Sequence, residues 1–277
     1  MTIYRTKTLE ETYRYKAGST DINELNGRPG RRDLTDFVAD QILKKIRLNM
    51  GDTLIDVGCG DGTLLKKIAK KGFDNNNCRI IGLLPSQEEV DRVKQDFFKN
   101  KSLHYPKVSI LRGKAEKIDL PNDFCDHIIC NSVLHGSGQR LENVKSAIKE
   151  FNRVMKIGGE LYIGEMPEIN ELNGKNYGNS LIGWLIYLIR RKGFSAFIIG
   201  LKAVIISLLT KEPFIITPKF MFFIKSADFE DMLQSYGFRL LKKMRHYEID
   251  GSGNKVLSET RWNYKAVKDK TYLPSRD

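Results

Sequence analysis

The chain has 277 residues, of which 41% are hydrophobic and 29% charged, and this ordinary globular composition suits one large α/β domain with an elaboration, or two small domains. The four cysteines form no C-x-x-C pair and have no histidine at metal-binding spacing, so we expect reduced, buried thiols and no metal site. The charged N-terminus lacks the apolar run of a secretory signal, which favours the cytoplasm. The formal net charge of +12 indicates an anionic partner, for which nucleic acid, an acidic membrane surface and a phosphorylated substrate are alternatives.

An N-terminal flap is predicted for residues 1–32, which are rich in Tyr, Arg and Gly and end in the turn sequence NGRPGRR. Asp33 is predicted to cap the helix that follows, in which apolar residues from Leu34 to Ile46 share one face. The sequence NMGD at 49–52 should end this helix just before a strand. Two roles stay open for four side chains of the flap region, which either reach a bound ligand or are ordinary surface or packing residues: Tyr13, Tyr15, Arg31 and Arg32.

The stretch TLIDVGCGDGTLLKKI, at residues 53–68, predicts a buried strand, a glycine-dense turn and a helix. Asp56 stands near the carboxyl end of the strand, where open α/β sheets place their ligands. Gly58, Gly60 and Gly62 follow at every second position. Such glycines are needed where the backbone turns sharply and lets a ligand approach without an intervening Cβ.

The spacing of these glycines excludes two common nucleotide sites. A dinucleotide fingerprint would place its third glycine at Thr63, and a P-loop would need a Lys-Ser or Lys-Thr pair, which does not follow here. The run DVGCGDG at 56–62 instead resembles motif I of the class I S-adenosylmethionine-dependent methyltransferases. This resemblance implies S-adenosyl-L-methionine as the cofactor, bound by Asp56, Gly58, Cys59, Gly60 and Gly62.

Two later strands depart from the family's pattern at cofactor positions. The second predicted strand ends in Leu84, where the family has an Asp or Glu that accepts hydrogen bonds from the ribose hydroxyls. The ribose therefore needs another partner, such as Ser86 or Gln87, or is held more weakly. After the third strand, Lys114 stands where the family has an Asp for the adenine amino group. The residues expected to border the ribose and the adenine are Leu84, Ala115 and Glu116.

The remaining motifs match the family in order and spacing. The sequence LPNDFCD at 120–126 leads into a fourth strand, and KEFNRVMKIGGEL at 149–161 resembles E-x-x-R-V-L-K-P-G-G-x-L, a helix that passes through a Gly-Gly turn into a fifth strand. A helix at 226–237 and a hairpin around 250–254 supply the sixth and seventh strands. The resemblance implies a single methyltransferase domain over 1–277, with an α/β, Rossmann-like, seven-stranded, mostly parallel sheet and helices on both faces.

Residues 166–225 exceed what the core needs after the fifth strand and predict an apolar and basic helical insertion. Its apolar runs are interrupted by the basic cluster at 190–192 and by Lys202, so neither run spans a bilayer. Three alternatives stay open: a lid over the substrate cleft, peripheral membrane contact through residues 181–210, and a homodimer interface.

Methyl transfer from a sulfonium is an in-line displacement, so it requires alignment and, for a hydroxyl acceptor, a base. The candidate catalytic residues are His135, after the fourth strand, and Glu165, at the end of the fifth. A structural histidine that closes its turn is the alternative for His135. Asn131 and Ser132 are expected to line the cofactor side of the cleft.

The implied function is methylation of a small-molecule or lipid-linked acceptor on oxygen, in the cytoplasm or at the membrane face. Leu84 and Lys114 motivate an alternative, a methyltransferase-like binding or scaffold subunit without catalysis. RNA methylation rests on the basic charge alone, and no N-P-P-[YF] sequence appears, which disfavours the amino-methylating nucleic-acid and protein-glutamine branches. The acceptor and the oligomeric state stay open, because substrate contacts come from the flap and the insertion rather than from the shared core.

Overall fold

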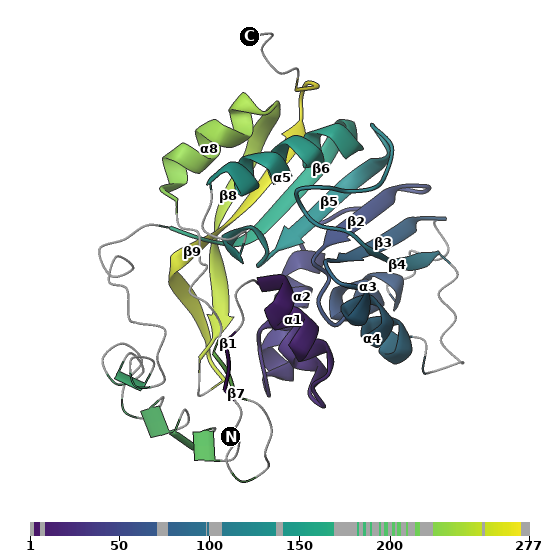
Figure 1. The fold of residues 1–277 in the computed structure, drawn as a ribbon. Helices are drawn as coiled ribbons and strands as arrows, with labels where there is room; N and C mark the ends of the chain where they lie inside the picture. The colour runs from purple at the N-terminus through teal and green to yellow at the C-terminus, as the bar shows by residue number, and fades with distance from the viewer. Residues whose placement is uncertain are drawn as a thin grey trace.

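A computed structural model of the protein describes residues 3–5, 9–70, 77–97, 99, 107–136, 141–168, 214–216, 224–250 and 253–272, with scattered positions between 182 and 209. Two sheets and their surrounding helices build this part of the chain (Figure 1). The strands are β1 (Ile3–Arg5), β2 (Thr53–Val57), β3 (Arg79–Leu84), β4 (Val108–Arg112), β5 (Cys125–Asn131), β6 (Met155–Pro167), β7 (Phe214–Ile216), β8 (Phe238–Ile249) and β9 (Lys255–Lys268). The helices are α1 (Leu9–Ala17), α2 (Arg32–Leu43), α3 (Thr63–Lys70), α4 (Gln87–Phe97), α5 (Leu141–Val154) and α8 (Ser226–Ser235), with the short 3-10 helices η1 (Ile22–Asn26) and η3 (Leu134–Gly136).

The larger sheet has seven strands in the order β4-β3-β2-β5-β6-β9-β8. Strands β4 to β6 pair in parallel, whereas β9 lies antiparallel between β6 and β8. The prediction of a Rossmann-like, seven-stranded and mostly parallel sheet is confirmed. The chain builds outward from β2 in both directions, and open α/β sheets bind ligands at this switch point, beyond the carboxyl ends of the strands.

Helices cover both faces of the seven-stranded sheet (Figure 1). Helices α5 and α8 pack on one face in a core that includes Ile55 and Ile128, and α2, α3 and α4 pack on the other in a core that includes Leu54 and Ile80. Because successive residues of a strand point to opposite faces and both faces are buried, the central strands are mostly apolar. Asp56 is the charged exception on β2, and it lies at the carboxyl end of that strand.

The N-terminal segment and the predicted insertion are joined by a ladder that the sequence did not predict. Strand β1 pairs in parallel with β7, with Ile3 opposite Phe214 and Arg5 opposite Ile216. The base of the insertion is closed by an isolated bridge between Glu168 and Ile224. Most of the insertion between these two residues lies outside the described part of the chain.

The prediction that Asp33 caps a helix is wrong. Helix α2 begins at Arg32, its N-cap residue is Arg31, and no side chain caps it. The Asp33 carboxylate instead accepts a hydrogen bond from the Arg31 guanidinium at 2.9 Å. An ion pair between close neighbours has therefore taken the carboxylate that would have capped the helix.

The predicted Gly-Gly turn between the fifth strand and the preceding helix is also wrong. Helix α5 ends at Val154 and β6 begins at once with Met155. Gly158, with φ of +81°, lies within β6, where the pairing with β5 shifts its register. The two glycines lie where residues 156–159 of β6 stand opposite Asp126 of β5, so they accommodate an irregularity in the ladder rather than a helix-to-strand turn.

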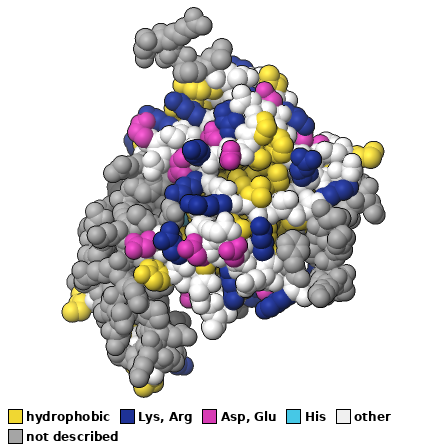
Figure 2. Space-filling model, turned by 45° about the vertical axis from the view of Figure 1, so that its right-hand side comes forward, with side chains coloured by type: hydrophobic (Ala, Val, Ile, Leu, Met, Phe, Trp, Pro, Cys, Tyr) yellow, Lys and Arg dark blue, Asp and Glu magenta, His cyan; other side chains and the backbone are white. Residues whose placement is uncertain are grey.

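The structure describes the state of the cysteines and the distribution of charge on the surface. All four cysteines are free and buried, as predicted. On the face shown in Figure 2, Lys and Arg side chains are interspersed with Asp and Glu side chains, so the positive charge is not gathered there into one patch. None of the helices in the described part of the chain is long and apolar enough to cross a bilayer.

Candidate functional site

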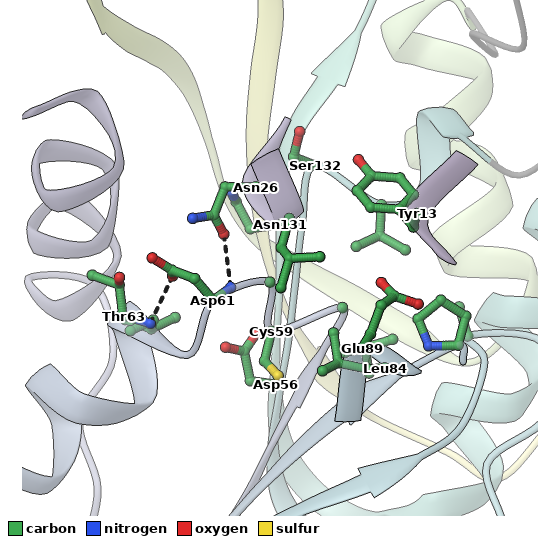
Figure 3. Close-up of a pocket in the computed structure, with 18 of the residues that line it drawn as sticks. Tyr13, Asn26, Asp56, Cys59, Asp61, Thr63, Leu84, Glu89, Asn131 and Ser132 are labelled. Atoms are coloured by element: carbon green, nitrogen blue, oxygen red, sulfur yellow. Dashed lines mark hydrogen bonds between the residues drawn. The ribbon is translucent and has the colours of Figure 1, made fainter. Parts of the chain in front are cut away.

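A cavity of about 560 Å³ opens at the carboxyl ends of β2, β3 and β5, a volume typical of small-molecule sites. Its walls come from the loop after β2, the ends of β3 and β5, the turn after β4, helix α2 and the N-terminal segment (Figure 3). Gly62 and Glu165 are not among its lining residues. The predicted site residues that do line it are Asp56, Gly58, Cys59, Gly60, Leu84, Ala115, Glu116, Asn131, Ser132 and His135.

The glycine loop has the conformation that its sequence requires. Gly58, Gly60 and Gly62 have φ of +72°, +55° and +75°, in the left-handed region that glycine adopts without steric cost. A Cβ at Gly58 or Gly60 would collide with side chains of the loop after β5 or of η1, whereas a Cβ at Gly62 would lie 3.1 Å from the Phe97 ring. Gly58 and Gly60 therefore shape the cavity wall, and Gly62 allows α3 to pack against α4.

Asp56 is a buried carboxyl group on the cavity wall. It makes no hydrogen bond or ion pair with any residue that the structure describes, and burial, followed by the negative charge of Asp61, raises its pKa to about 7. Asp61 is itself engaged, because it accepts hydrogen bonds from the Thr63 backbone and the Arg32 guanidinium, both at 2.9 Å. The Asp56 carboxyl is therefore set to ionise when a cation enters the cavity.

A carboxylate that the sequence did not assign lies beside Leu84. Glu89, in the first turn of α4, is buried and lines the same wall of the cavity (Figure 3). Its Oε2 accepts hydrogen bonds from the Ser86 backbone at 3.1 Å and from the Ser86 hydroxyl at 2.6 Å. Ser86 and Gln87, the replacements expected for the missing acid, do not line the cavity; Ser86 instead holds Glu89 in place.

His135 lies in η3, directly after β5, and faces the cavity. Burial, followed by the positive charge of Arg261, lowers its pKa to about 4, so the imidazole is neutral near pH 7. Its Nδ1 is buried and has no hydrogen-bond partner among the described residues. The ring can therefore exchange a proton or a hydrogen bond with a ligand in the cavity.

Glu165, the second candidate base, lies outside the cavity wall and is fully engaged. Its buried carboxylate forms ion pairs with Arg28 and, at 2.7 Å, with Arg261, and it accepts a hydrogen bond from the Asn131 amide at 2.9 Å. Although burial alone would raise its pKa, the charges of Arg28, His246 and Arg261 and the Asn131 hydrogen bond lower it to about 2. A carboxylate of such low basicity anchors arginines better than it accepts protons.

The N-terminal segment contributes cavity residues of which the sequence identified only one. Tyr13 lines the cavity as predicted, but Arg28 does so as well, and its position in the sequence NGRPGRR, which has three arginines, gave no signal that would single it out. Tyr15 is exposed, and Arg31 and Arg32 pair with neighbouring carboxylates. Only the tertiary contact with Glu165 distinguishes Arg28 from these arginines.

Buried polar atoms without partners indicate a missing ligand. Within the described ranges, Asn26 Nδ2, Thr63 Oγ1, Asn131 Oδ1 and His135 Nδ1 are buried and unpaired, and all four residues line the cavity. Such atoms are costly unless something binds them. Together with Asp56 and the glycine wall they fit a polar ligand that carries a cation and hydroxyl groups, which is the chemistry of S-adenosylmethionine.

The family comparison agrees with this geometry. A family model described as a methyltransferase domain matches residues 55–163, from β2 into β6. This part of the chain is a methyltransferase domain. This match agrees with S-adenosylmethionine as the cofactor that the motif I loop implies.

A curated relative matches a longer stretch of the chain. The ubiquinone/menaquinone biosynthesis C-methyltransferase UbiE of Coxiella burnetii is 27% identical over 168 residues, which are 59% of this chain and 61% of the relative. The chain spans only 55% to 61% of the length of the first curated relatives that it matches. The comparison thus supports the domain more strongly than any particular acceptor.

Solved structures extend the likeness to almost the whole chain. A SAM-dependent methyltransferase from Methanosarcina mazei has a TM-score of 0.54 at 19% identity, covering 82% of this chain and 96% of its own. The [4+2]-cyclase SpnF has a TM-score of 0.60 at 16% identity, covering 96% of this chain and 98% of its own. At these identities the likeness shows a shared fold.

Proposed function

We propose that the protein transfers a methyl group from S-adenosylmethionine to a hydroxyl oxygen of a small or lipid-linked acceptor. The observation that carries this proposal is one cavity in which the motif I loop, the unpaired Asp56 and the neutral His135 meet. The likeness to a protein named as a quinone-biosynthesis C-methyltransferase supports a small-molecule acceptor. It also makes carbon the alternative site of methylation.

Three parts of the cavity wall suit three parts of the cofactor. The glycine loop and Asp56 would take the methionine end, because an ionised carboxylate pairs with an ammonium group. Glu89 would accept hydrogen bonds from the ribose hydroxyls in place of the absent acid at Leu84. Ala115 and Glu116 would border the adenine ring.

Methyl transfer requires the protein to align the methyl donor with the acceptor and to provide one proton acceptor. Bound S-adenosylmethionine supplies a methyl group on a sulfonium, whose thioether leaving group needs no protonation. The acceptor hydroxyl loses its proton as its oxygen bonds to the methyl carbon, and His135 is placed to receive that proton. A histidine with a pKa of about 4 is a weak base, which suits an acidic phenol or enol rather than an alcohol.

The test uses the full chain, S-adenosylmethionine and a panel of phenols, catechols and quinols. Calorimetry should show binding of the cofactor and of its demethylated product, and isotopic label from the methyl group should appear on an acceptor oxygen. The variant His135→Asn should lower kcat by roughly tenfold, less than a well-matched base would cause, without changing the Kd of the cofactor. Absence of cofactor binding would refute the proposal, and label on a ring carbon would move the reaction to the alternative product.

Asp56 should give cofactor binding a pH dependence. In the empty protein its carboxyl is half neutral near pH 7, since its pKa is raised to about 7, and only the ionised form pairs with an ammonium group. Affinity should therefore rise by up to about tenfold between roughly pH 6 and pH 8 and level off above that. Asp56→Asn should bind weakly at every pH in the same titrations. A wild-type Kd that is constant over this range would contradict the role.

A further inference from the structure

The inserted segment turns an apolar face outward. Among its described helical positions, Phe194, Ile198, Ile205 and Leu209 are 44% to 78% exposed. On a helix with 3.6 residues per turn, sequence spacings of four, seven and four correspond to an arc of about 60°. We refer to these four side chains as the apolar stripe.

Not every apolar side chain in the described part of this segment is exposed. Val204 lies outside the arc of the apolar stripe and is buried. Ile182, Ile186 and Ile189, at spacings of four and three, repeat the pattern of exposed apolar side chains earlier in the segment. Surface helices normally expose polar residues and bury their apolar face, so this arrangement calls for an apolar surface outside the chain.

The charge of the inserted segment indicates which kind of apolar surface it could contact. The 40 residues from 172 to 211 contain six Lys and Arg residues and no Asp or Glu, so a segment of this length carries half of the chain's net charge of +12. Lys202, which is exposed, stands within the span of the apolar stripe. An apolar face with exclusively basic charge beside it complements an anionic lipid surface.

We propose that the apolar stripe docks on an anionic membrane surface, with its side chains among the acyl chains and the neighbouring Lys and Arg residues at the lipid phosphates. A second copy of the chain fits less well, because the same positive segment would face itself. A nucleic acid would leave the apolar stripe exposed to water. This docking goes beyond the transferase chemistry and does not depend on it.

The topology connects the docking segment to the cavity. Figure 1 shows the described pieces of the segment on the outside of the molecule, well away from α5 and α8. Strand β7, which follows the segment, pairs with β1, and only residues 6–8 separate β1 from α1, whose Tyr13 lines the cavity. A membrane-bound insertion would therefore be tied through this ladder to the helix that covers the site.

Vesicle sedimentation with the full chain tests the docking. The protein should pellet with vesicles of phosphatidylcholine and phosphatidylglycerol in equal amounts, and at least about tenfold less with phosphatidylcholine alone or in high salt. A variant with Phe194→Ser, Ile198→Ser and Ile205→Ser should lose at least about tenfold in vesicle affinity. The matched control carries Leu241→Ser, Val256→Ser and Leu257→Ser, which replace equally exposed apolar side chains on β8 and β9, and it should pellet like the wild type.

Two results would overturn the docking proposal. One is equal pelleting of the stripe variant and the wild type. The other is a wild type that ignores vesicles but forms a dimer that the stripe variant abolishes, which would assign the stripe to a second copy. Calorimetry with S-adenosylmethionine on the same variants checks that each is folded. If the wild type itself does not bind the cofactor, that result counts against the proposed function and not against the docking.

Discussion

Replacing Glu165 by glutamine is expected to lower the free energy of unfolding by about 3–5 kcal/mol. The Glu165 side chain is only 4% exposed and compensates Arg28 and Arg261, which are 13% and 28% exposed. Its neutral replacement would leave two guanidinium groups in a poorly solvated place without their counter-charge, and breaking a buried pair costs far more than losing a surface pair. Urea denaturation followed by circular dichroism measures the change.

The matched control for this loss is Glu160→Gln on the same strand. Glu160 pairs with Lys265 at 3.0 Å, but its side chain is 30% exposed, so we expect a change within about 1 kcal/mol. Glu165→Asp keeps the charge and should recover much of the stability. If Glu165→Gln instead unfolds like the wild type and loses turnover, Glu165 is a base after all and the anchoring role is wrong.

Acid should weaken the same contact in a defined direction. The pKa of Glu165 is lowered from 4.5 to about 2 in the folded protein, so its contribution to stability is present above the unfolded value and is lost as the pH falls from about 4.5 through 2. The Glu165→Gln variant should lack this part of the pH dependence. The contact ties the N-terminal segment to β6, so its loss should loosen the cover of the cavity as well as the fold.

Features encoded in short stretches of sequence were predictable. The loop from Asp56 to Gly62 has its glycines at the three positions that need a left-handed backbone, so the residue pattern itself indicates these positions. The continuous apolar character of β2 and its neighbours reflects burial on two faces, which favours a parallel sheet between helices. Such signals lie within short stretches of sequence, so they can be recognised without the tertiary structure.

Features that depend on distant contacts were not predictable. Arg28 and Glu165 are 137 positions apart, and nothing in either surrounding sequence indicates that they meet. The β1–β7 ladder likewise joins two three-residue strands that are too short to give a periodic pattern. The cap at Asp33 failed for a different, local reason, since the same carboxylate could bond either the helix end or Arg31, and local sequence favours both.

The relation between Leu84 and Glu89 was only partly predictable from the sequence. Motif comparison treats one position at a time, so it showed the loss of an acid at the end of β3 and offered Ser86 or Gln87 as a substitute. The carboxylate lies one helical turn further on, where α4 begins and brings it back to the same wall of the cavity. We therefore propose that the departure from the family pattern is a change of position rather than a loss of charge.

Glu89→Gln is expected to weaken binding of S-adenosylmethionine by about a hundredfold, because two hydroxyl groups would lose a charged acceptor. The Ser86 hydrogen bonds fix the carboxylate on the cavity wall, so little entropy is lost when a ligand binds to it. Calorimetry at a pH above 7, where Asp56 is ionised, measures the Kd without interference from that group. Glu88→Gln is the matched control, since Glu88 adjoins Glu89 but is 53% exposed and pairs with Arg14, and its Kd should stay within about twofold of the wild type.

A rescue variant separates a displaced acid from a site that has lost its function. Adding Leu84→Asp to Glu89→Gln should restore most of the affinity, because it returns a carboxylate to the end of β3. Leu84→Asp alone should give little gain, since a second carboxylate beside Glu89 adds like-charge repulsion to the burial of a polar group. If Leu84→Asp alone creates strong binding where the wild type has none, the protein is a methyltransferase-like subunit with an abandoned cofactor site, and Glu89 serves only to cap α4 through Ser86.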